Sequence, residues 1–178
     1  KLPTDTASLA DRIKELFEII QLGAEREKFS CQEGPLRGKI RNFEGSDRIY
    51  EMGDKEIRVI GYDVQQTSKF PNVLKEIVNA SPNTILVRDA KIPCSGNVTQ
   101  KLLRKFKQNK VFIWMKESDI ADLHALGSLL AKMREGDFQD YQTKPQPTPD
   151  NILRCLSDMA VFEKKEITKA FKRMSGID

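Results

Sequence analysis

Three short apolar runs, separated by segments with helical periodicity, constrain the fold of this chain most strongly. The runs cover residues 56–62, 84–88 and 111–115. They are strand-sized, rich in β-branched residues and without regular polar alternation, as is typical of strands buried on both faces. Helical segments of about 10–15 residues between strands favour βαβ crossovers. The sequence therefore predicts an α/β fold with a small parallel sheet.

The segments between and after these runs carry apolar residues at helical spacing. In residues 97–108, for example, Val98, Leu102 and Phe106 recur every four positions and share one side of a helix. We expect helices over residues 72–80, 97–108 and 118–134. The predicted core is a three-layer βαβαβα arrangement.

The flanking segments are less regular. Residues 6–22 carry an apolar stripe that predicts an N-terminal helix. Residues 24–55 are rich in glycine and charge, and we expect them to be mostly irregular, with short elements around 37–43 and 47–52 or an added edge strand.

The C-terminal part predicts a separate helical extension. Three alternating prolines in residues 139–149 favour a stiff, extended linker. Helices are expected over residues 150–158 and 164–174, an arrangement that matches part of a helix-turn-helix. The predicted division is an α/β domain over 1–138, a linker over 139–149 and an extension over 150–178.

Cysteine and histidine usage gives no indication of a metal centre. The three cysteines, Cys31, Cys94 and Cys155, lie far apart, and His124 is the single histidine. A disulfide framework and a metal knuckle are therefore not expected. We expect reduced thiols, no cofactor and no metal.

No membrane span is expected, because no apolar run approaches the about 20 residues that a bilayer requires. No signal peptide is expected, because the start of the sequence has no apolar h-region. The expected location is cytoplasmic or nuclear. The chain begins with Lys1 rather than Met and stops just after a helical segment. We therefore expect a domain of a larger protein, with the other domains of that protein among its partners.

Nucleotide-binding signatures are missing. The sequence has neither GxxxxGK[ST] nor GxGxxG, so independent ATPase or dehydrogenase activity is not expected. Residues 85–89 do form an apolar strand ending in Asp89, as in a Walker B strand. A fragment lying beside an ATPase core in a longer protein stays an alternative.

Each predicted strand ends near a carboxylate, and parallel sheets bind ligands at that edge. Asp63, followed by Asp89, Ala90 and Lys91, superficially resembles the PD-(D/E)xK nuclease pattern. No proline precedes Asp63, and a helix rather than a hairpin separates the two acids. The alternative function is therefore a Mg²⁺-dependent nuclease or phosphotransfer domain that uses Asp63, Asp89 and Lys91.

An anion site is predicted where a helix opens after the second strand. Ser95, Gly96 and Asn97 start this helix, and its free backbone N–H groups can hold a phosphate. Cys94 lies in the same loop, where a helix N-terminus can lower a thiol pKa. His124 belongs to another helix, so a Cys–His nucleophile is not expected.

Basic residues provide the leading functional indication. Residues 97–110 contain five cations and no acid, whereas the cations near the C-terminus are mixed with Glu163 and Glu166. Aromatic residues do not interleave with either cluster, so single-strand stacking is not predicted. We expect a non-catalytic interaction or nucleic-acid-associated domain, with DNA or RNA as ligand; a pure protein–protein module is a third possibility. The predicted nucleic-acid-binding residues are Lys101, Arg104, Lys105, Lys107, Lys165 and Lys169.

Overall fold

The computed structural model describes residues 30–62, 68–134, 151 and 165–176. Within these ranges five strands form one sheet, in the order β1-β2-β3-β4-β5. The strands are β1 (Ser30–Glu33), β2 (Ser46–Met52), β3 (Lys55–Gly61), β4 (Thr84–Asp89) and β5 (Val111–Met115). The helices are α2 (Leu36–Lys39), α3 (Phe70–Ile77), α4 (Asn97–Phe106), α5 (Glu117–Arg134) and α7 (Glu166–Ser175).

The sheet is mixed, which corrects the expectation of a purely parallel one. The three predicted strands are confirmed as β3, β4 and β5, and they pair in parallel. β1 and β2 add an antiparallel part. The cause is the two-residue turn between β2 and β3, where Gly53 adopts a left-handed conformation with φ 60°. So short a connection forces antiparallel pairing, since a parallel crossover needs a dozen or more residues.

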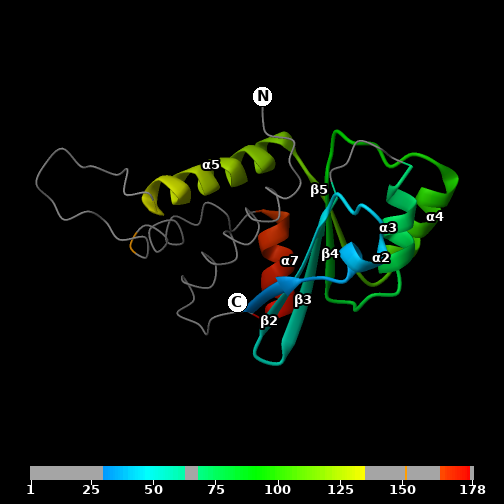
Figure 1. Cartoon of the computed structure of the whole chain (residues 1–178), viewed down its shortest axis with the longest axis horizontal. Coiled ribbons are helices and arrows are strands. Elements are labelled where there is room, and N and C mark those ends of the chain that lie inside the picture. The colour runs from blue at the N-terminus through cyan, green and yellow to red at the C-terminus, as the bar shows by residue number, and fades with distance from the viewer. Residues whose placement is uncertain (1–29, 63–67, 135–150, 152–164, 177–178) are drawn as a thin grey trace, which may run out of the picture.

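Helices cover both faces of this sheet, as predicted for a three-layer fold (Figure 1). Ile60 and Leu86 face α2, α3 and α4 in one buried cluster. Val59 and Val87, their neighbours along the strands, face α5 and α7 in the other. Successive strand residues point to opposite faces, so each strand contributes to both clusters.

Helix α7 packs against the sheet. Ile167, Ala170 and Phe171 are buried, and the Phe171 ring meets the ring of Tyr50 edge-to-face with centroids 6.3 Å apart. The predicted N-terminal helix, the linker and nearly all of residues 150–158 lie outside the described residues. The division at 139–149 and the helix-turn-helix therefore stay predictions.

An ion pair fastens the β1–β2 connection to β3. The Asp47 carboxylate accepts hydrogen bonds from Arg58 Nε at 2.8 Å and Arg58 Nη2 at 2.7 Å, and from the Leu36 backbone N–H at 2.9 Å. Both side chains are largely buried, with 3% of Asp47 and 11% of Arg58 exposed. A side chain at Gly34 would collide with this carboxylate, since an added Cβ would lie 2.2 Å from it.

None of the helices described above combines the length and apolarity needed to cross a membrane.

Candidate functional site

Helix α4 presents four exposed cations. Its apolar side packs on α3 and the sheet through Leu103 and Phe106, and these contacts direct the polar side outwards. Among the described residues no carboxylate forms an ion pair with these four cations. The basic face of α4 consists of Lys101, Arg104, Lys105 and Lys107. It is a rigid, one-sign surface suited to an extended polyanion.

Two aromatic rings of β5 continue this surface. Lys107 Nζ lies 4.8 Å from the centroid of the Phe112 ring, a cation–π distance. The Phe112 ring meets the Trp114 ring edge-to-face, with centroids 4.8 Å apart. Trp114 is 39% exposed. We call Phe112 and Trp114 the aromatic edge. Its proximity to the cations of α4 was not predicted from the sequence.

The alternation of residues along β5 could have indicated the aromatic edge from the sequence. Lys110, Phe112, Trp114 and Lys116 occupy alternate positions and therefore fall on one face of the strand. Lys110 itself is an anchor: its ammonium is buried and donates to Val78 O at 3.0 Å. Burial, and then the nearby Lys105, lower the pKa of Lys110. The start of β5 is thus fastened to the end of α3.

No protein-family model, curated protein or solved structure matches this chain. Its function is therefore inferred from its own residues, and first from the basic face of α4 and the aromatic edge.

The two cations predicted on the C-terminal helix lie elsewhere. Lys165 precedes α7, on the sheet face opposite α4, and donates to Asp119 at 2.6 Å and Asp122 at 2.5 Å. Burial alone lowers the pKa of Lys165, but the two carboxylates outweigh it and the net shift is upward. Lys169 is exposed and donates to Glu166 at 3.2 Å. Both charges are thus locally balanced and do not extend the basic face of α4.

The predicted anion site lies at the start of α4. Ser95, Gly96 and Asn97 are exposed, and Gly96 is the N-cap residue with φ 95°. No side-chain hydrogen bond caps this helix, and its first turn contains no acidic residue. Among the described residues, no side chain accepts a hydrogen bond from these N–H groups, and the anion site stays a prediction.

Cys94 is buried beside a buried arginine. Burial raises the pKa of the Cys94 thiol, and the Arg88 charge and hydrogen bond offset this only in part. Arg88 is fully buried, donates from Nη1 to Tyr62 O at 2.7 Å and lies 4.3 Å from the centroid of the Phe70 ring. Its Nε and Nη2 atoms have no hydrogen-bond partner among the described residues. The burial of Arg88 is a second feature that was not predicted from the sequence.

Cys94 is expected to react slowly with iodoacetamide in the folded protein at neutral pH, since the thiolate is the nucleophile and a raised pKa keeps the thiol protonated. The measurement is the rate of carbamidomethylation at Cys94, followed by peptide mass spectrometry with and without urea. Unfolding should accelerate the reaction by roughly ten-fold or more. Equal rates would show that the thiol is open to solvent.

His124 is not placed to activate the Cys94 thiol, because it belongs to α5 on the other face of the sheet.

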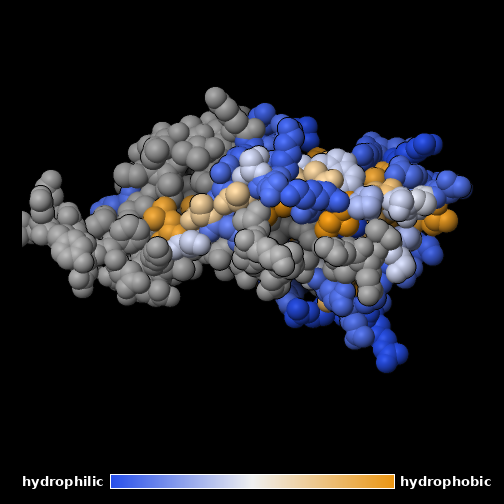
Figure 2. Space-filling view, turned by 90° about the horizontal axis from the view of Figure 1, so that it is seen from above, coloured by the Kyte–Doolittle hydropathy of each residue, from blue (hydrophilic) through white to orange (hydrophobic). Residues whose placement is uncertain are grey.

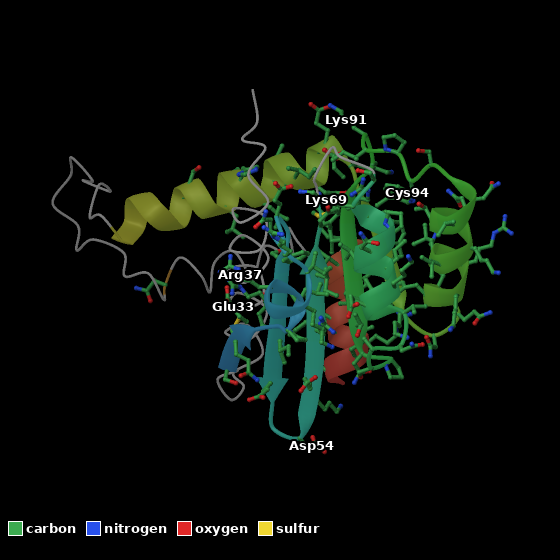
Figure 3. The ribbon with its side chains drawn as sticks, turned by 45° about the vertical axis from the view of Figure 1, so that its right-hand side comes forward. Glu33, Arg37, Asp54, Lys69, Lys91 and Cys94 are labelled. Atoms are coloured by element: carbon green, nitrogen blue, oxygen red, sulfur yellow. The ribbon has the colours of Figure 1, made fainter. Side chains whose placement is uncertain are left out.

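The carboxylates of the alternative nuclease reading are only partly described. Asp89 accepts a hydrogen bond from the Lys91 backbone N–H at 2.8 Å, and Lys91 Nζ pairs with Glu117 at 2.6 Å. Figure 3 shows Lys91 at the end of the sheet opposite the turn that carries Asp54. Asp63 lies outside the described residues. Within the described part no group of three His, Cys, Asp or Glu side chains is placed to hold a metal ion.

A small pocket of about 20 Å³ opens beside Trp114, between the end of β5 and helices α5 and α7. Apolar side chains of the sheet and both helices form much of its wall, and Lys165 and Asp119, already paired with each other, add charge. Its lining residues are Ile113, Trp114, Met115, Asp119, Leu123, Lys165, Glu166 and Ile167. No cation in this lining is left to attract a phosphate.

Proposed function

We propose that this protein is a non-catalytic nucleic-acid-binding domain of a larger intracellular protein, with the basic face of α4 against the phosphate backbone. The observation that carries the proposal is the exposure of four cations along α4 and its C-cap residue, none of which forms an ion pair with a carboxylate of the described residues. Each cation that meets a phosphate releases condensed counterions, which gives an affinity that falls steeply with salt.

The shape of the basic face favours a polymer over a small phosphate. From Lys101 to Lys107 the helix rises by about 9 Å. Phosphates of one duplex strand are spaced by about 3.4 Å along the axis, so this length meets more than one of them. A single phosphate ion is too small to contact cations spread over this length.

The surroundings of α4 support the proposal in a second way. Hydrophilic side chains predominate at the end of the molecule that carries α3 and α4, with isolated hydrophobic ones between them (Figures 1 and 2). The helix is held by Thr99, Leu103 and Phe106, all buried. A charge array on a rigid element loses little entropy when it binds.

Reversing Lys101, Arg104 and Lys105 together to Glu should weaken binding by roughly 100-fold or more at low salt. The readout is fluorescence anisotropy of labelled DNA and RNA oligonucleotides at about 50 mM and about 200 mM salt. The wild type should lose affinity with salt, and the reversed variant should show a shallower slope, smaller by about two to three units.

The matched control reverses three exposed cations on other helices, Lys39, Lys169 and Arg173, and changes net charge equally. It should bind within a few-fold of the wild type. A greater loss in this control would place the interface outside α4. Absence of wild-type binding at low salt, or Mg²⁺-dependent cleavage of the oligonucleotide, would overturn the proposal.

A further inference from the structure

We infer that the nucleic acid bound at α4 is single-stranded and that one of its bases stacks on Trp114. This inference rests on the proposed function and specifies its ligand. The observation behind it is the contiguous array in which Lys107 contacts Phe112, and Phe112 contacts Trp114. Positive charge and an exposed aromatic ring thus lie on one surface, as in proteins that bind single strands by backbone charge and base stacking.

The Trp114 ring is held in place before any ligand arrives. Phe112 packs partly buried against the α3–α4 cluster and meets Trp114 at an interplanar angle of 86°. Lys110, hydrogen-bonded to Val78 O, fixes the start of the strand. An aromatic ring with few rotatable bonds and a fixed neighbour offers contact area at low entropic cost.

Exposure of Trp114 also differs from that of its neighbours in β5. Ile113 and Met115 point to the other face of the sheet and are buried against the cluster that includes α5 and α7. Trp114 and Val98 are the exposed large hydrophobic side chains of the described residues, and Trp114 is the aromatic one. An exposed indole beside cations that no described carboxylate pairs with is suited to a ligand that carries both phosphates and flat rings.

The stacking geometry selects single strands over duplexes. In a duplex the bases are stacked on one another and paired, so a ring on a sheet surface has no base face to meet. In a single strand a base can turn onto Trp114 while neighbouring phosphates meet Lys107 and the rest of the basic face. Stacking of this kind depends little on sequence, because every base has a π face.

The test uses the fact that Trp114 is the single tryptophan of the chain. Its fluorescence therefore reports on the proposed stacking site alone. At low salt the protein is titrated with a thymidine oligonucleotide, with an abasic strand of the same number of phosphates, and with a duplex of equal length. We expect the thymidine strand to quench Trp114 and to bind roughly ten-fold more tightly than the abasic strand, which should not quench.

Variants separate stacking from charge. Trp114→Ala should bind the thymidine strand no more tightly than the wild type binds the abasic strand, and Trp114→Phe should retain part of the preference. Val98→Ala, which shortens the other exposed large hydrophobic side chain of the described residues, should leave both affinities unchanged. Circular dichroism of each variant checks that the fold is retained.

The possible failures are distinguishable. Equal affinity for the thymidine and abasic strands without quenching overturns the single-strand inference and leaves the proposed function standing. Tighter binding of the duplex than of the thymidine strand would likewise overturn the single-strand inference and leave the proposed function standing. Absence of binding to all three probes overturns the proposed function itself.

Discussion

Replacing Asp47 with alanine is expected to lower the free energy of unfolding by about 3–5 kcal/mol. The substitution leaves the Arg58 guanidinium, 11% exposed, without its carboxylate and also removes the acceptor of the Leu36 N–H. A buried charge that loses its partner costs more than the pair contributes, because its desolvation is no longer compensated. Urea denaturation followed by circular dichroism measures the effect.

Two companion variants make this result interpretable. Asp54→Ala, in the exposed β2–β3 turn, should change stability by less than about 1 kcal/mol. Asp47→Asn keeps an acceptor for the Leu36 N–H but removes the charge. Its loss of stability should lie between those of Asp54→Ala and Asp47→Ala. A loss at Asp47→Ala as small as that of the Asp54 control would mean that the ion pair does not secure the β1–β2 connection.

Replacing Phe171 with alanine is expected to destabilise the protein by about 3–5 kcal/mol. Phe171 is fully buried in the cluster between α7 and the sheet, where it meets the Tyr50 ring. Truncation removes its buried area and leaves a cavity that the strands cannot fill. Thermal and urea unfolding by circular dichroism supply the measurement.

Arg173→Ala is the matched control for Phe171, since it lies on the same helix and is exposed. It should change stability by less than about 1 kcal/mol. If Phe171→Ala left the unfolding transition of the sheet unchanged, α7 would belong to a separate cooperative unit. A single unfolding transition at lower temperature and lower urea concentration would show that α7, which follows the predicted linker, unfolds together with the sheet.

The α/β core was predictable because its signals are local. Strand runs of β-branched residues and helical rows of apolar residues lie in single segments, and each can be recognised without knowing what it packs on. The strands β3 to β5 and the helices α3, α4, α5 and α7 were found in this way, with ends that differ by a few residues. In the β1–β2 part, the short element expected around residues 47–52 is confirmed as β2. The bounds of β1 and the register of the two strands were not predicted, since they depend on contacts across a glycine-rich segment.

The candidate site was predictable only in part, and for the same reason. The cations of α4 lie within one helix, so their shared face follows from periodicity. The contact between Lys107 and Phe112 joins a helix end to a neighbouring strand. Phe112 and Trp114 were predicted as core-type strand residues, because the sequence does not show which side chains of β5 the helices leave uncovered.

The order of the elements and the presence of a basic helix follow from the sequence alone, because periodicity encodes which side of each element is apolar. Which charges remain available to a ligand was decided by tertiary packing. Lys165 is paired with Asp119, 46 positions away, whereas the described carboxylates leave the basic face of α4 unpaired. Pairing of charges and exposure of rings depend on distances between elements, and those distances exist only once the layers have packed.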